Sequence, residues 1–133
     1  MLLLSDLNDA EQYIYLKCLA AVAQVDTVFD DEEINLFMVV AGSLGLSQER
    51  SRQILEEVPL LPQEVPVMRP AVAEVILKDM VAIATCNHEL LPSEIQLIGQ
   101  MASAMGVSSQ QVNHCLQSGR HRFFALTSDF LPS

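Results

Sequence analysis

The chain has 133 residues, of which half are apolar and only 18% are charged. This length fits one domain with a sizeable core, and the composition argues against disorder. Seventeen acidic residues against seven basic ones give a net charge of −10. This charge disfavours binding to the phosphates of nucleic acids and to anionic membranes. It favours solubility, or cations and basic proteins as partners.

The three cysteines, Cys18, Cys86 and Cys115, lie far apart in apolar stretches without a CxxC spacing. We therefore expect reduced, buried thiols and a cytoplasmic location. The N-terminal residues lack the basic start of a signal peptide. No apolar run reaches the roughly 20 residues that a membrane-spanning helix needs, so we expect no membrane span.

Helix-start and helix-stop signals organise the first half of the chain. Capping boxes, in which the side chain of each of two residues accepts the backbone N–H of the other, are predicted at Asn8–Glu11 and Asp30–Glu33. Gly45 follows the second helix, where positive φ is needed, and Ser47 can cap a third. The helices predicted in this half cover about 9–25, 31–44 and 48–57.

The segment Val58–Pro70 contains four prolines and predicts an extended linker that lies along the protein surface. Beyond it, Pro92 can begin a helix, Gly106 can end it and Ser108 can cap the next. The helices predicted in this half cover about 71–86, 92–104 and 109–117. The first of them is apolar nearly all round, so we expect it to be the most central. The tail is expected to dock Phe123, Phe124, Leu126 and Phe130 on the core.

The two halves are copies of one pattern. Residues 16–55 align with 77–116 at a fixed offset of 61, and eleven of these forty positions are identical. Copied units usually share one core, because a single unit cannot bury its apolar face alone. We therefore predict an all-α fold: a compact helical bundle of two tandem three-helix repeats plus a short C-terminal helix or tail, in a single domain over 1–133. Its parts are repeat 1 (about 9–57), the linker (58–70), repeat 2 (about 71–117) and the tail (118–133).

Residues 23–34, followed by Leu44-Gly45-Leu46-Ser47, resemble the TerB-like family of tellurite-resistance proteins, and so does the second copy at 84–95 and 106–108. The family pattern joins an alanine-rich helix, an Asp-Gly turn with a later Glu, and a helix ending in Leu-Gly-Leu. The N-terminal region of a membrane-anchored J-domain co-chaperone is a related module. The resemblance covers about 16–116, but Thr27 and Asn87-His88 depart from the Asp-Gly turn. It implies a bacterial, all-helical stress-response module that binds divalent cations or partner proteins, with no enzymatic reaction.

The segment 26–33 holds five acids in eight residues. Such a density of hard oxygen ligands suits Ca²⁺ or Mg²⁺. Its spacing is not that of an EF-hand, because Asp31 occupies the place of the invariant glycine. Acids at a helix start also cap its free N–H groups, which explains Asp30 and Glu33 without a metal. The candidate metal ligands are Asp26, Asp30, Asp31 and Glu33, with Asn87, Glu89 and Glu94 as the weaker counterpart in the second copy.

Glu33 and Glu94 are the only acids identical in both copies. They are either paired ligands that meet across the bundle or two glutamates that each close a capping box. Lys17 and Lys78 are also identical, and a lysine whose head reaches solvent at the bundle edge is the simplest interpretation of each. A transition-metal site that joins Asn87, His88, Glu89 and Glu94 to His114 or His121 follows no known spacing.

These observations predict a non-catalytic binding module whose acidic segment faces a divalent cation or a basic protein partner. The sequence offers no phosphate-binding loop, nucleophile elbow or HExxH motif. The alternative is a protein-interaction scaffold or a homodimer, recognised through the apolar linker Leu60–Met68 or the phenylalanine-rich tail.

Overall fold

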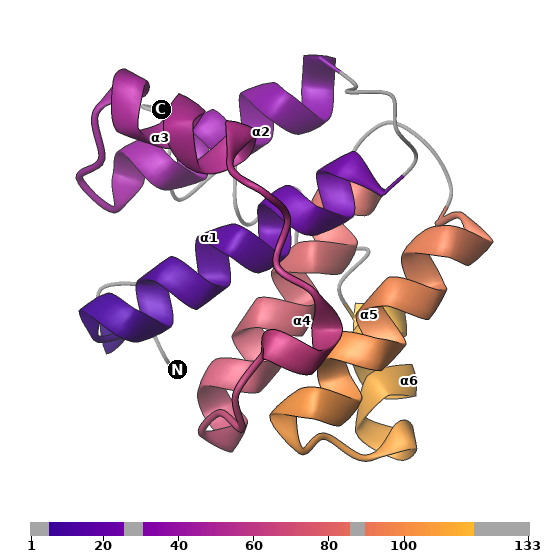
Figure 1. Cartoon of the computed structure of the whole chain (residues 1–133). Coiled ribbons are helices and arrows are strands. Elements are labelled where there is room, and N and C mark those ends of the chain that lie inside the picture. Colours follow the sequence, from indigo (N-terminus) through magenta and orange to yellow (C-terminus); the bar gives the residue numbers. More distant parts are fainter. Residues whose placement is uncertain (1–5, 26–30, 86–89, 119–133) are drawn as a thin grey trace.

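The computed structural model describes residues 6–25, 31–85 and 90–118, and every regular element in these ranges is helical (Figure 1). The elements are α1 (Asp9–Gln24), α2 (Asp31–Ser43), α3 (Gln48–Glu56), the 3-10 turn η2 (Pro62–Glu64), α4 (Pro70–Ala84), α5 (Pro92–Met105) and α6 (Ser109–Ser118). The predicted all-α class is therefore confirmed for the described part of the chain. None of the helices described combines the length and apolarity that crossing a bilayer requires.

The helix ends have the predicted chemistry. Asn8 Oδ1 accepts the Glu11 N–H at 2.8 Å, and Glu11 Oε1 accepts the Asn8 N–H at 3.0 Å, which completes the first capping box. Ser47 Oγ accepts the Arg50 N–H at 3.1 Å at the start of α3. Gly45 follows α2 with φ of 88°, and Gly106 follows α5 with φ of 89°; this left-handed conformation favours glycine.

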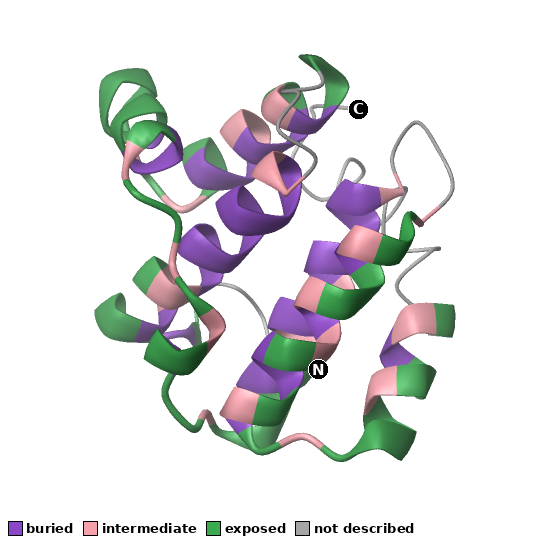
Figure 2. Ribbon diagram, turned by 45° about the vertical axis from the view of Figure 1, so that its right-hand side comes forward, coloured by how far each residue is buried: buried purple, intermediate pink, exposed green. Residues whose placement is uncertain are grey.

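The core lies between α1 and α4. The largest side chains of α4 are fully buried, and α1 contributes small alanines that let the two helices approach closely. Figure 2 shows buried residues gathered on the inner sides of the helices, whereas the outer sides are exposed. Helix α4, the first helix of the second half, contacts α1, α2, α5 and α6, and it shares the centre of the bundle with α1, which also contacts four helices.

The second half follows the first in the order and spacing of its helices. Helices α4, α5 and α6 each begin 61 residues after α1, α2 and α3. Within the first half α1 contacts α2 and α3, and within the second half α4 contacts α5 and α6. Figure 1 shows α1 and α4 running toward the upper right of the molecule, where α2 and α5 begin.

Residues 57–69, here called the strap, cross one face of the bundle and connect its halves (Figure 1). Within the strap, Val65 is buried, and the Met68 N–H donates to the Met105 carbonyl at 3.3 Å. The guanidinium of Arg69 binds both carboxylate oxygens of Glu11, each at 2.8 Å. The linker therefore lies along the surface as the sequence predicts, and its end is fixed to α1.

Candidate functional site

The predicted acidic site falls on the first turn of α2 and the first turn of α5. Asp31 and Glu32 are exposed at the start of α2, whereas Glu33 is only 4% exposed. Glu94 is fully buried at the matching place in α5, and its Oε1 accepts the Leu91 N–H at 2.8 Å. The remaining predicted ligands lie outside the described residues. These are Asp26, Asp30, Asn87 and Glu89.

Glu94 therefore performs the capping role that the sequence offered as the alternative to metal binding. Its carboxylate satisfies a backbone donor at the helix start and lies near the positive end of the helix dipole. The Asp30–Glu33 capping box involves a residue outside the described part. In the ranges 6–25, 31–85 and 90–118, no group of three His, Cys, Asp or Glu side chains converges in a way that could hold a metal ion.

The histidines do not add to this site in the described structure. His114 is exposed on α6 and lines a different pocket, and His88 and His121 lie outside the described residues. The pocket has a volume of about 370 Å³ and lies between α4, α6 and the end of the strap. Its apolar lining includes Met68, Met105, Val107 and Cys115.

The polar edge of this pocket includes Glu74 of α4 and His114 of α6. The Lys78 ammonium lies 2.6 Å from Glu74 Oε1, and its hydrogen bond lowers the pKa of the Glu74 carboxyl. The His114 imidazole lowers it further. Burial raises the pKa of the Cys115 thiol, so the pocket holds no activated nucleophile at that position. The pocket offers apolar contact and a charged edge, and no local pattern of residues predicts it.

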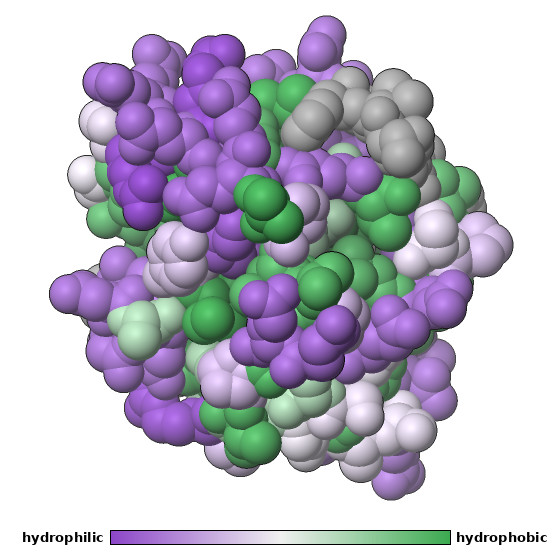
Figure 3. Space-filling view, viewed as in Figure 1, coloured by the Kyte–Doolittle hydropathy of each residue, from purple (hydrophilic) through white to green (hydrophobic). Residues whose placement is uncertain are grey.

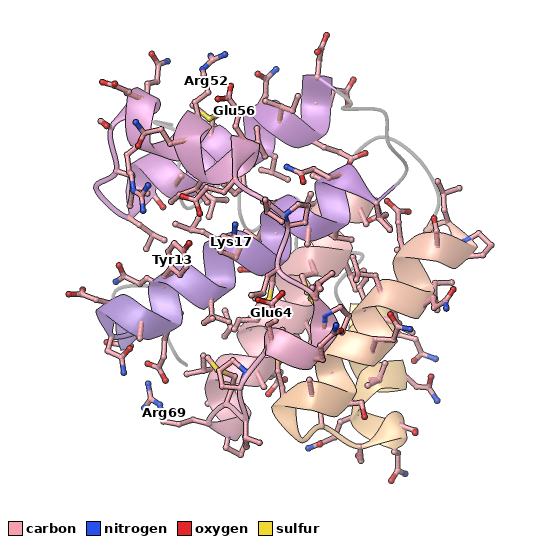
Figure 4. The ribbon with its side chains drawn as sticks, in the orientation of Figure 1. Tyr13, Lys17, Arg52, Glu56, Glu64 and Arg69 are labelled. Atoms are coloured by element: carbon pink, nitrogen blue, oxygen red, sulfur yellow. The ribbon has the colours of Figure 1, made fainter. Side chains whose placement is uncertain are left out.

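The interpretation of Lys17 as a lysine whose head reaches solvent is wrong. It is only 5% exposed, and its Nζ donates to the Val58 carbonyl at 2.8 Å and lies 3.3 Å from Glu57 Oε2. The Tyr13 hydroxyl donates to the same Glu57 oxygen at 2.7 Å. Figure 4 shows Tyr13 and Lys17 on the edge of α1 that faces α3. The lysine is buried because the end of α3 and the start of the strap cover it and supply its partners.

A buried polar contact joins the two central helices. The Tyr15 hydroxyl of α1 donates to Asp79 Oδ2 of α4 at 2.6 Å, and both residues are fully buried. Asp79 occupies the place that Cys18 holds in the first copy, and this difference between the copies is a signal that could have pointed to it. The thiols are as predicted where the structure describes them. Cys18 and Cys115 are free and buried, and burial raises the pKa of Cys18 to about 12.

No protein-family model matches this chain, and comparison with curated proteins and with solved structures finds no match either.

Proposed function

We propose that this protein is a non-catalytic, TerB-like binding module of a cytoplasmic stress response. In this proposal the acidic segment 26–33 presents carboxylates either to a divalent cation, here called the cation form, or to a basic protein partner. The donors are those that the sequence indicates: Asp26, Asp30, Asp31 and Glu33, with Asn87, Glu89 and Glu94 in the second copy. The support for the family and for tellurite resistance is the resemblance in sequence.

The observation that carries the proposal is the pair of buried glutamates in equivalent first turns. Glu33 is 4% exposed and Glu94 is fully buried, although a carboxylate loses hydration when it is buried. Helices α2 and α5 begin on the same side of the molecule, and all three helix starts of the second half follow the first by 61 residues. This spacing supports two tandem three-helix repeats, which would bring the two acidic turns to one edge.

The distribution of charge gives further support. Four of the five lysines and arginines in the described ranges form ion pairs with glutamates outside the segment 26–33. The exposed carboxylates of Asp31 and Glu32 thus add to a surface whose cations are largely engaged elsewhere. Such a surface attracts metal cations and basic partners through its unbalanced negative charge.

Thermal unfolding with Ca²⁺, Mg²⁺ and Zn²⁺ tests the cation form. A ligand that binds only the folded state stabilises it by about 2.7 kcal/mol at a hundred times its dissociation constant, so the melting temperature should rise. Glu33→Gln should abolish the rise, measured against the metal-free variant. Glu49→Gln is the matched control, because Glu49 is an exposed acid in the first turn of α3. If no cation at millimolar concentration moves the melting temperature, the cation form fails.

A second candidate function is a protein-interaction scaffold, and the strap favours it. Val58 is 85% exposed, Val67 is 78% exposed and Leu61 is 49% exposed, all within one short segment. Figure 3 shows hydrophobic side chains among polar ones in the middle of the face that the strap crosses. The homodimer is one version of this candidate. Sedimentation at several protein concentrations tests it, because a dimer through this face would dissociate on dilution.

A further inference from the structure

The strap contains two apolar–proline pairs separated by a single residue. Val58-Pro59 is the first pair, Leu61-Pro62 is the second, and Leu60 lies between them. Proline-rich segments favour the polyproline II helix, which has three residues per turn. Residues three positions apart therefore lie on the same side of such a helix, so the two pairs should face the same way.

The backbone at Glu57, just before the segment, and at Leu61 is close to polyproline II, and the 3-10 turn η2 begins at Pro62. Glu57 has φ −63° and ψ 158°, and Leu61 has φ −81° and ψ 148°. These values lie close to the polyproline II angles of about −75° and +145°. The Pro59 ring fixes its own φ near −65° and excludes the helical region for Val58 before it.

The exposed fractions of the side chains agree with this geometry. Val58 is 85% exposed, Leu61 is 49% exposed and Pro59 is exposed, whereas Leu60 is half-buried and packs against the hydrophobic core. Val58, Pro59 and Leu61 thus point outward, whereas Leu60 and Pro62 are half-buried. Each pair thus presents at least its apolar side chain, Val58 or Leu61, to a pocket of a partner.

Both ends of the segment are fixed. The Lys17 ammonium binds the Val58 carbonyl at 2.8 Å, and the Leu61 N–H donates to Glu64 Oε1 at 3.1 Å. Between these anchors, the carbonyl oxygens of Pro59 and Leu60 accept no hydrogen bond from the described residues. The segment is therefore ordered before any partner binds, which lowers the entropy cost of binding, and it keeps two acceptors for a partner.

We propose that Val58–Pro62, extended as far as Leu61, is a polyproline II ligand that binds a partner domain with an aromatic-lined groove, of the kind found in SH3 and WW domains. Exposed Glu56 and Glu64 flank the segment, and the chain carries a net charge of −10. The groove of the partner should therefore be bordered by basic residues. This inference rests on the interaction scaffold, the second candidate function above, and names its partner.

Isothermal titration of the full-length protein with a set of purified SH3 and WW domains whose grooves have basic borders tests the proposal. We expect binding to at least one domain. Val58→Ser should then weaken binding at least tenfold, since the side chain is exposed in the free protein and buried in the complex. Val67→Ser is the matched control, because Val67 is 78% exposed on the same strap but lies outside the motif, and it should leave the affinity unchanged.

Chemical shifts provide an independent readout. Addition of the bound domain to ¹⁵N-labelled protein should move amide resonances within 57–64 and leave those of α6 in place. The proposal is overturned if no domain in the set binds, or if Val58→Ser and Val67→Ser weaken binding equally. If Val58→Ser and Val67→Ser instead weaken self-association equally in sedimentation, the scaffold stands as a homodimer and the polyproline II ligand is rejected.

Discussion

Substitution of the two tyrosines of the chain separates a buried polar contact from an exposed one. Tyr15 is fully buried, and its hydroxyl donates to the fully buried Asp79 at 2.6 Å. Tyr15→Phe keeps the ring and withdraws one donor from a buried carboxyl group, which costs about 1–3 kcal/mol. The free energy of unfolding falls by about 2 kcal/mol per molar urea, so the urea concentration at the unfolding midpoint should fall by roughly 0.5–1.5 M.

Tyr13→Phe is the control for this change. Tyr13 is 39% exposed, and its acceptor Glu57 has a side chain that is 33% exposed, so water replaces the lost hydroxyl. Its cost should stay below about 0.5 kcal/mol. Urea unfolding followed by circular dichroism measures both variants. Equal midpoints for the two would refute the reasoning that burial makes the Tyr15–Asp79 contact important for stability.

Two further predictions concern Glu57 and the glycines. The hydrogen bond from the Tyr13 hydroxyl, above all, lowers the pKa of Glu57 from its ordinary value of 4.5. The Glu57 carboxylate therefore contributes its full stabilisation above pH 4.5. This contribution is lost as the pH falls through the lower pKa of the folded state. Melting temperatures between neutral and acidic pH should therefore fall less steeply for Glu57→Gln than for the exposed control Glu56→Gln. Gly106→Ala should destabilise by about 1–2 kcal/mol, because its φ is 89°. Gly99→Ala, inside α5 with open space around it, should stabilise by about 0.5–1 kcal/mol in the same urea assay.

The helices were predictable because their signals are local. Asn8, Ser47 and Gly45 act within a few residues of their own positions, so a single sequence contains the whole interaction. The largest difference from the predicted boundaries is at α4, which ends at Ala84 and not near residue 86, whereas the other helix ends agree within one residue. The Thr85 hydroxyl donates to the Val81 carbonyl at 2.7 Å, and the backbone of Thr85 has left the helical region.

The contacts between distant segments were not predictable in this way. Lys17 reaches Glu57 across 40 residues, and Tyr15 reaches Asp79 across 64. No periodicity in either helix specifies such a partner, because it depends on how the helices cross. A charged residue in the apolar run of α4 was the available sign that Asp79 has a special environment. In the acidic site, the sequence explained the role of Glu94 in capping, but its complete burial follows only from the packed structure.

We propose that the acidic first turns of α2 and α5 act together in binding a cation. An NMR titration of ¹⁵N-labelled protein with Ca²⁺ tests it most directly, because the amide resonances of Glu33 and Glu94 report each turn separately. The account predicts that both resonances shift and saturate at the same Ca²⁺ concentration. Shifts at only one turn, or equal shifts at the unrelated acid Glu49, would contradict it.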